Sequence, residues 1–215
     1  MSKIKSICVY CGSGTGNDPA YVDAAKALGK AMAEQGITLV YGGGAIGLMG
    51  AVAYAVLDHG GKVHGIIPKF LMSRERALRG THELVVTENM HERKQKMFEA
   101  ADAFVALPGG IGTLEEVVEQ MTWAQLGQHR KPILLANING FWDPLASLLL
   151  HMRRTEFIRY GLDVEILKAD RVDEIIPKLK AAVAMVSEGA ESSEAVVAPE
   201  AVEGYIYAQG LYTAP

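Results

Sequence analysis

The sequence predicts an α/β fold, a Rossmann-like doubly wound parallel sheet flanked by helices. Apolar runs of strand length recur seven times along the 215 residues, and helical patterns separate them. Most of these runs are continuously apolar, which is typical of strands covered on both faces. Repeated alternation of strand and helix favours a parallel sheet with right-handed crossovers.

The expected elements follow from these runs and from the residues that begin and end helices. We expect strands at residues 4–10, 37–41, 62–67, 83–86, 103–107, 132–136 and 164–168. Asp18 is a favourable N-cap, Pro19 suits the first helical position, and Gly36 closes that first helix. The other helices are expected at residues 46–58, 90–101, 113–126, 143–158 and 172–186.

The chain divides into a body, residues 1–186, and an acidic tail, residues 187–215. The length suits one domain, so we expect the body to be a single Rossmann-like domain. The tail carries five Glu and no Lys or Arg; without these charges the net charge of −4 becomes +1. Its first half resembles a flexible linker. Its aromatic end, Tyr205 to Tyr212, has three open interpretations: it docks on the body, docks on a second subunit, or makes no contact.

Composition excludes several classes of function. No apolar stretch reaches the about 18 residues of a membrane span, and the N-terminus lacks a signal-peptide core, so we expect a cytoplasmic protein that contacts no membrane. No dense Lys/Arg block is present, which argues against a nucleic-acid partner. Cys8 and Cys11 form one C-x-x-C without a second pair, and buried thiols are favoured over a redox or zinc site. The six His show no metal-binding pattern, and no metal or cofactor is expected.

Three glycine-rich segments follow expected strands and are the candidate binding site. They are loop one (residues 11–16), loop two (residues 42–50) and loop three (residues 108–113). In doubly wound folds ligands bind at the carboxyl ends of the strands, where all three loops converge. Glycine lets backbone N–H groups approach an anion closely. One such loop would suit a tight turn alone, but three favour a phosphate-bearing ligand, with Ser13, Gly43, Gly44 and Gly109 among its contacts.

Two common nucleotide motifs are not met. The P-loop pattern G-x-x-x-x-G-K-[ST] is absent. Residues 42–47 only loosely resemble G-x-G-x-x-G, and Asp58, 16 residues past Gly42, ends a helix instead of the next strand. NAD binding is therefore weakly supported, because no acidic residue is placed for the ribose.

Glu116 has two interpretations. Thr113 and Glu116 have capping-box spacing, so the carboxylate can cap its own helix. If a phosphate takes the helix N–H groups instead, Glu116 lies beside an anion and needs a cation, which Arg93 and Lys94 supply. Glu116, Glu119 and Trp123 share a helix face, with Thr122 near it. A phosphate site with a carboxylate and an Arg suits cleavage of a bond in a phosphorylated ribose, by analogy with glycosidases.

Residues 108–116, Pro-Gly-Gly-Ile-Gly-Thr-Leu-Glu-Glu, resemble the hallmark P-G-G-x-G-T-x-x-E of the LOG (Lonely Guy) family of cytokinin riboside 5′-monophosphate phosphoribohydrolases. The resemblance covers roughly residues 4–185. It includes the segments CVYCGSGTG (8–16), YGGGAIGLMG (41–50), MHERK (90–94), TWAQLG (122–127) and GFWDPL (140–145).

The resemblance implies a Rossmann-like homodimer that hydrolyses AMP or N6-substituted AMP to the free base and ribose 5-phosphate, with no metal or cofactor. It implies that Arg93 and Glu116 are the catalytic pair. The residues it implies for substrate binding are Gly110, Ile111, Gly112, Thr113, Leu114, Glu115, Lys94 and Thr122, with Glu75 matched by spacing alone.

With this resemblance, we expect the body, residues 1–186, to be a single Rossmann-like nucleotide-binding catalytic domain. Some relatives resemble molybdenum-cofactor carriers, so the alternative function is a non-catalytic nucleotide or phospho-cofactor carrier. Many relatives carry a lysine decarboxylase label, but no pyridoxal-phosphate signature is recognisable here, and that activity is not expected. Ser13-Gly14 stands where many relatives have Ser-Ser.

Overall fold

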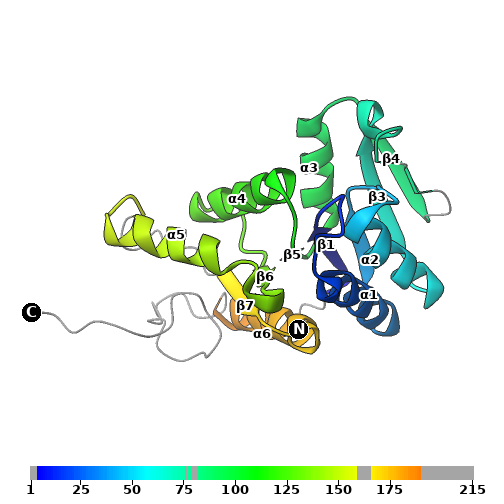
Figure 1. The fold of residues 1–215 in the computed structure, drawn as a ribbon. Helices are drawn as coiled ribbons and strands as arrows, with labels where there is room; N and C mark the ends of the chain where they lie inside the picture. Colours follow the sequence, from blue (N-terminus) through cyan, green and yellow to red (C-terminus); the bar gives the residue numbers. More distant parts are fainter. Residues whose placement is uncertain (1–3, 76, 79–81, 159–165, 190–215) are drawn as a thin grey trace, which may run out of the picture.

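A computed structural model describes residues 4–75, 77–78, 82–158 and 166–189 (Figure 1). Its strands form one parallel sheet in the order β4-β3-β2-β1-β5-β6-β7. This confirms the predicted fold class. The strands are β1 (Ser6–Tyr10), β2 (Thr38–Tyr41), β3 (Val63–Pro68), β4 (Glu83–Thr87), β5 (Ala103–Ala106), β6 (Ile133–Ala136) and β7 (Ile166–Ala169).

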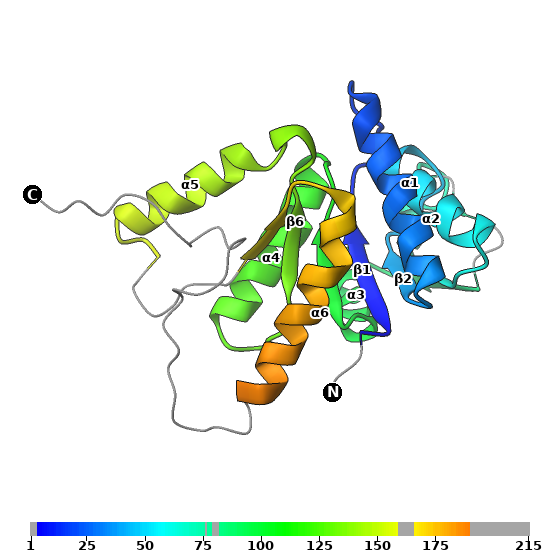
Figure 2. The same ribbon diagram turned by 90° about the horizontal axis from the view of Figure 1, so that it is seen from below.

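Helices cover both faces of the sheet (Figures 1 and 2). The helices on one face are α1 (Pro19–Glu34), α2 (Gly47–Asp58) and α6 (Val172–Gly189). Those on the other are α3 (Met90–Ala100) and α4 (Ile111–Gln125), with α5 (Asp143–Arg154) beyond α4. Short 3₁₀ turns η1 (Lys69–Leu71) and η2 (Ile138–Gly140) follow β3 and β6. Successive side chains of a strand enter opposite cores: Ile7 packs with α1 and α2, and Cys8 with α3 and α4.

Element boundaries differ from the predictions in two informative places. Helix α4 begins at Ile111, two residues before the predicted start, because Gly110 is its N-cap. Helix α5 ends at Arg154, four residues before the predicted end. Glu156 has φ +62°, and a residue with this φ cannot continue a right-handed helix. Residues 164–165 of the last predicted strand and residues 190–215 of the tail lie outside the described residues. Within the described ranges, no helix is long and apolar enough to span a membrane.

The strand order reverses at β1. The chain builds the sheet from β1 outward to β4 and then returns to the other side of β1 with β5. Ligands bind at such reversal points, outside the carboxyl ends of the strands. Loop one and loop three leave β1 and β5 here, and they touch: the N–H of Gly12 donates to the carbonyl of Pro108 at 3.1 Å.

Helices α1 and α2 pack closely because Gly29 has no side chain. A Cβ at this position would lie 2.5 Å from the carbonyl oxygen of Val52 and 2.9 Å from Cβ of Ala55. The first of these neighbours is helix backbone, which cannot move aside as a flexible side chain would. Gly29 therefore sets the spacing of the two helices that follow β1 and β2.

We predict that Gly29→Ala lowers the free energy of unfolding by about 1–3 kcal/mol, because the overpacking exceeds the gain in helix propensity of about 1 kcal/mol. Urea unfolding followed by circular dichroism measures the change. Lys26→Ala, at an exposed position of the same helix, is the control and should stay close to wild type. A Gly29→Ala protein as stable as wild type would contradict this account of the helix contact.

Candidate active site

The N-terminus of α4 is open. Its N-cap, Gly110, offers no side chain, and the first main-chain bond of the helix is from the N–H of Leu114 to the carbonyl of Gly110 at 3.0 Å. The preceding amides, Ile111 to Thr113, thus have no acceptor within the helix. Ile111 is 82% exposed. The capping-box interpretation of Thr113 and Glu116 is wrong, because no side chain caps this helix. An uncapped N-terminus attracts an anion through these amides and the helix dipole.

Loop three can turn into α4 only because Gly109 has no side chain. A Cβ there would overlap the hydroxyl of Thr113 and would lie 2.9 Å from the amide nitrogen of Gly12. Thr113 is itself buried beneath the turn. Loop one and loop three are therefore packed backbone against backbone at the predicted phosphate site.

Loop two differs from the prediction. The amides at the start of α2 are already bonded: the N–H of Leu48 donates to the carbonyls of Gly12 (3.0 Å) and Gly14 (3.2 Å), and that of Met49 to Gly12 (3.3 Å). Gly47 has φ +60° and lies against the main chain of Ser13. The sequence grouped loop two with the phosphate-binding loops, but the amides of Leu48 and Met49 are not available to an anion, because loop one caps α2. Loop two braces loop one.

Gly43 and Gly44 pack against the segment that follows η1. The N–H of Leu78 donates to the carbonyl of Gly43 (2.9 Å), and the N–H of Ala45 donates to the carbonyl of Glu75 (3.0 Å). Gly44 pairs with Ala77 in a β-bridge. These contacts bring Glu75 to the site, although its segment aligned poorly by sequence. Its Oε2 is buried and has no hydrogen-bond partner among the described residues. Burial raises the pKa of this carboxyl, while the charge of Arg93 opposes the shift.

Arg93 of α3 and Glu116 of α4 face each other, as predicted. Nη2 of Arg93 lies 3.5 Å from Oε1 of Glu116, and the two side chains are only 7% and 10% exposed. Asn89 caps α3 by accepting from the N–H of Glu92 at 2.9 Å, which sets Arg93 within the first turns of that helix. Nε of Arg93 has no partner among the described residues. The guanidinium therefore has donors left for a ligand.

Sequence reasoning missed the part played by Gly42. A Cβ at this position would overlap Nη2 of Arg93. Gly42 is the first residue after β2, so the bare backbone at this strand end makes room for the guanidinium. The run of three glycines was interpreted only as a phosphate-binding loop. Nothing in the sequence indicated that the first of them makes room for an arginine side chain.

Burial of Glu116 raises its pKa to about 7. The charge of Arg93 lowers the pKa and thus limits the shift, the carboxylates of Glu115 and Glu75 add to it, and Lys94 opposes it. A carboxyl group with a pKa near neutrality exchanges a proton readily at physiological pH. A strongly shifted group in a cleft is a common mark of a functional site.

Lys94 joins α3 to α4. Its Nζ donates to Oε1 of Glu115 at 2.6 Å and to Oε1 of Glu119 at 2.9 Å, and its side chain is 10% exposed. Two of the three ammonium donors are thus engaged within the protein. The predicted contacts of Lys94 and Glu115 with substrate stay predictions. In this structure the two residues form a bridge that aligns the helices carrying Arg93 and Glu116.

The predicted shared face of α4 is found, but Thr122 is not on it. Glu119 and Trp123 line a cavity of about 360 Å³ with Lys94, and Trp123 meets the ring of Phe98 edge-on at 5.2 Å. The hydroxyl of Thr122 donates to the carbonyl of Val118 at 2.8 Å. Thr122 lines a separate apolar groove between α4 and α5. Within one chain, therefore, Thr122 is not brought together with Arg93 and Glu116.

Cys8 and Cys11 are free and buried, as predicted. Burial raises the pKa of both thiols well above the ordinary value, so neither forms a reactive thiolate at neutral pH. Among the described residues, no three His, Cys, Asp or Glu side chains come together to hold a metal ion.

Comparisons with known proteins agree with the motifs. A family model described as "Possible lysine decarboxylase" matches residues 49–179. The cytokinin riboside 5′-monophosphate phosphoribohydrolase LOG of Oryza sativa subsp. japonica is 50% identical over 179 residues, which are 83% of this chain and 74% of the rice protein. The corresponding enzyme LOG1 of Arabidopsis thaliana is 46% identical over 179 residues, 83% of this chain and 84% of its own length.

A solved structure, the Moco carrier protein from Chlamydomonas reinhardtii, superposes with a TM-score of 0.64 at 22% identity, covering 85% of this chain and 99% of the carrier. At that identity the likeness shows the fold alone. The curated relatives and the family model, together with the complete P-G-G-x-G-T-x-x-E motif at the open end of α4, show that this chain belongs to the LOG family.

Proposed function

We propose that this protein hydrolyses the N-glycosidic bond of AMP or N6-modified AMP and releases the purine base and ribose 5-phosphate. The observation that carries the proposal is the buried Arg93–Glu116 pair, 3.5 Å apart, beside the uncapped start of α4. The curated relatives, at 46–50% identity, are named phosphoribohydrolases. A carrier has no evident need for a buried carboxylate of raised pKa, so the carrier alternative is not favoured.

The phosphate fits the start of α4. Its negative charge meets the amides of Ile111, Gly112 and Thr113, where the helix dipole is positive. The substrate's ribose then extends toward the second turn of the helix, where Glu116 lies. Phosphate binding thus places C1′ of the ribose beside the carboxylate and makes the reaction effectively intramolecular.

Bond cleavage follows from the charges at the site. As the bond from C1′ to the base nitrogen breaks, its electron pair leaves with the base and positive charge develops on the ribose. The Glu116 carboxylate stabilises that charge and accepts a proton from the attacking water, whose oxygen bonds to C1′. The base gains a proton, and Glu116 returns to the carboxylate. Arg93 holds Glu116 ionised and in place.

The body of the protein, residues 1–186, is proposed as the catalytic domain, and the cytoplasm as its location. The described elements from β1 to α6 share one sheet and the two cores on its faces, which supports a single unit. The two cysteines are free, which suits a reducing compartment.

A homodimer is proposed as the working state, with a second copy on the groove between α4 and α5. Helix α5 has no buried residue in the single chain, and Figure 1 shows it extending away from the sheet. Its inner stripe and the facing side of α4 are apolar; the groove is lined by Leu114, Val118, Met121, Leu145, Leu148, Leu149 and Met152. An exposed apolar surface of this kind marks a protein interface.

We predict that the wild-type protein releases free base and ribose 5-phosphate from AMP and from N6-isopentenyl-AMP, and that Glu116→Gln slows release by about 100-fold or more. The amide keeps the shape but neither stabilises positive charge nor accepts a proton. Chromatography quantifies the products, and calorimetry measures nucleotide binding, which should survive. The ratio of wild-type rates shows which substrate is preferred.

Glu99→Gln, at an exposed position of α3, is the matched control and should retain full activity. Equal loss of binding and turnover in Glu116→Gln would instead assign Glu116 a structural role. Wild-type protein that binds nucleotide tightly without releasing base would support the carrier function and overturn the hydrolase.

We predict that kcat/KM rises with pH along a limb whose midpoint is near pH 7. The pKa of Glu116 is raised to about 7, so the active carboxylate is lost as pH falls through that value. The same raised pKa means that the folded state binds a proton more tightly than the unfolded state. The stability linked to this proton is therefore present below pH 4.5 and lost as pH rises toward 7.

Glu75→Gln tests the assignment of this limb. Removing the Glu75 carboxylate removes a charge that raises the pKa of Glu116, so the midpoint should move to lower pH. A midpoint that stays fixed in Glu75→Gln would assign the limb to another group, such as the substrate phosphate, whose second pKa is about 6.

We predict that Leu148→Glu converts the dimer to a monomer, because a charge in the groove cannot be buried between two copies. Leu148 is 48% exposed in the single chain, so the fold should persist. Light scattering after size-exclusion chromatography measures the mass. Leu150→Glu, at another exposed leucine of α5 outside the groove, should leave the mass unchanged. A Leu148→Glu protein that is still dimeric would place the interface elsewhere.

A further inference from the structure

The segment of residues 137–143, between β6 and α5, lies at the same edge of the sheet as the site. It contains most of the GFWDPL motif, for which the proposed reaction has no direct use. Two of its residues, Asn137 and Trp142, are only 2% and 4% exposed. We call this segment the clamp.

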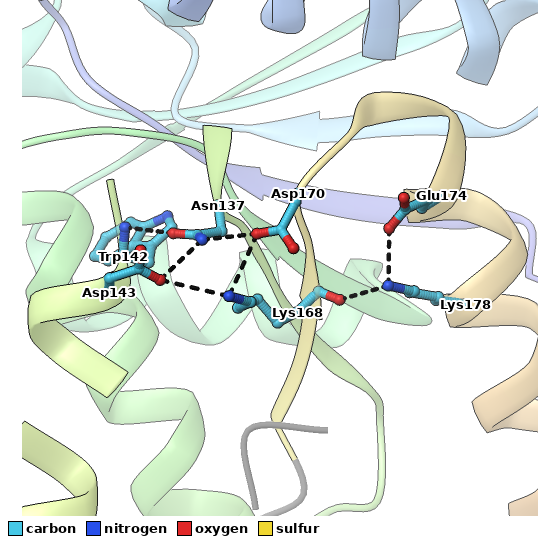
Figure 3. Close-up of polar contacts among 7 residues, drawn as sticks. All are labelled: Asn137, Trp142, Asp143, Lys168, Asp170, Glu174 and Lys178. Carbon is cyan, nitrogen blue, oxygen red and sulfur yellow. Dashed lines mark hydrogen bonds and ion pairs between the residues drawn. The ribbon is translucent and has the colours of Figure 1, made fainter. Parts of the chain in front are cut away.

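Asn137 is the centre of the clamp, and every polar atom of its side chain is engaged (Figure 3). Its Nδ2 donates to Oδ1 of Asp143 at 3.0 Å and to Oδ1 of Asp170 at 2.8 Å. Its Oδ1 accepts from the main-chain N–H of Trp142 at 2.8 Å. A buried amide with all its hydrogen bonds made is rigid, and leaving one of its partners unpaired is costly.

Charges on β7 and α5 fix this amide from the outside. Nζ of Lys168 lies 3.3 Å from Asp170 and 3.4 Å from Asp143, so one ammonium bridges both acceptors of Asn137 (Figure 3). The hydrogen bond from Asn137 and the charge of Lys168 hold the pKa of Asp170 below its ordinary value. Asp170 is therefore an ionised acceptor at neutral pH.

Trp142 carries the connection from the clamp to loop three. Its indole Nε1 donates to the carbonyl oxygen of Ala106 at 3.0 Å. Ala106 is the last residue of β5, and the chain runs from it through Leu107 and Pro108 into the Gly109–Gly110 turn. The indole thus holds the main chain at the point where it leaves the sheet toward the open amides of α4.

The clamp also reaches the segment that follows loop one. Nδ2 of Asn139 donates to Oδ2 of Asp18 at 2.8 Å, while Oδ1 of Asp18 caps α1 by accepting from Ala20. The ring of Phe141 meets that of Tyr21 edge-on at 5.7 Å. Both loops that approach the predicted phosphate are therefore anchored to the same segment.

We propose that Asn137 and Trp142 are positioning residues: the clamp fixes the exit of β5 and thereby the direction in which the amides of Ile111, Gly112 and Thr113 meet the substrate phosphate. The inference deepens the proposed function and rests on it for the identity of the substrate. Neither residue touches the reacting atoms. Their effect is on the binding of the phosphate, which contributes equally to the ground state and the transition state.

The test is Trp142→Phe, which keeps an aromatic ring in the core and removes the indole N–H. We expect the KM for AMP to rise by about 10-fold with kcat nearly unchanged, which is the signature of lost uniform binding. The dissociation constant of ribose 5-phosphate, measured by calorimetry, should weaken by a similar factor. A residue that only supports the fold would lower the melting temperature and leave both constants unchanged, and this outcome would overturn the proposal.

Two further variants keep the test decisive. Lys178→Met removes bonds to the carbonyl of Lys168 (2.8 Å) and to Glu174 (2.8 Å) in the outer part of the same network, and should leave KM unchanged. Asp143→Ala, at a side chain that is 58% exposed, removes one acceptor of Asn137 and should raise KM in the same direction as Trp142→Phe, by less. A rise in KM for Lys178→Met equal to that for Trp142→Phe would also overturn the proposal.

The ribose 5-phosphate measurement separates the two hypotheses. Wild-type protein that binds ribose 5-phosphate but releases no base overturns the proposed hydrolysis, while weaker binding by Trp142→Phe still supports the clamp. If the wild type hydrolyses AMP and Trp142→Phe has the same KM, the positioning role of the clamp is overturned and the proposed hydrolysis stands. Wild-type protein that neither binds ribose 5-phosphate nor releases base from AMP overturns both.

Discussion

The site depends on holding one guanidinium that is almost fully buried. Arg93 is only 7% exposed along its side chain, and a buried charge needs a partner of opposite sign and room for its planar head. Glu116 supplies the first at 3.5 Å, and the missing side chain of Gly42 supplies the second. Glu75 adds a second carboxyl group, whose Oε2 has no hydrogen-bond partner among the described residues. Burial raises the pKa of both carboxyl groups, and the charge of Arg93 opposes both shifts.

Besides Gly42, two glycines have different tasks near this cation, and only one of these tasks concerns phosphate. Gly110 leaves the N-terminus of α4 without a side-chain cap, so its amides stay open to an anion. Gly47 lets loop two meet loop one, and loop one then closes the N-terminus of α2 with its own carbonyls. Of these two helix starts at the carboxyl edge of the sheet, one is sealed by protein and the other is available. That asymmetry favours α4 over α2 as the site of the proposed phosphate.

The sequence predicted the strands well because buried parallel strands are continuously apolar, and all seven appear near their predicted positions. It predicted the Arg93–Glu116 pair because motif and strand-end reasoning pointed to the same residues. The sequence did not show that the N–H groups at the start of α2 are already bonded. Glycine-rich turns and anion sites have the same composition, and hydrogen bonds between loops cannot be seen in a sequence. Thr122, three residues after Glu119, lines the groove beside α5, so within one chain it does not lie with Glu116. Its predicted contact with substrate stays a prediction. The sequence did contain a signal for Asn137, because this residue directly follows a strand, as the three glycine-rich loops do.

Helix α4 belongs to the open anion site, to the Arg93–Glu116 pair and to the groove beside α5, each through a different part of its surface. Its N-terminus offers amides to an anion, one side presents Glu116 to Arg93, and another side presents Val118 and Thr122 to the groove beside α5. Lys94 and the clamp fix the helix from two directions, through Glu115 and through the exit of β5. A second copy on the groove would contact the same helix that carries Glu116. Assembly and catalysis would then be coupled through one helix, with no moving part between them.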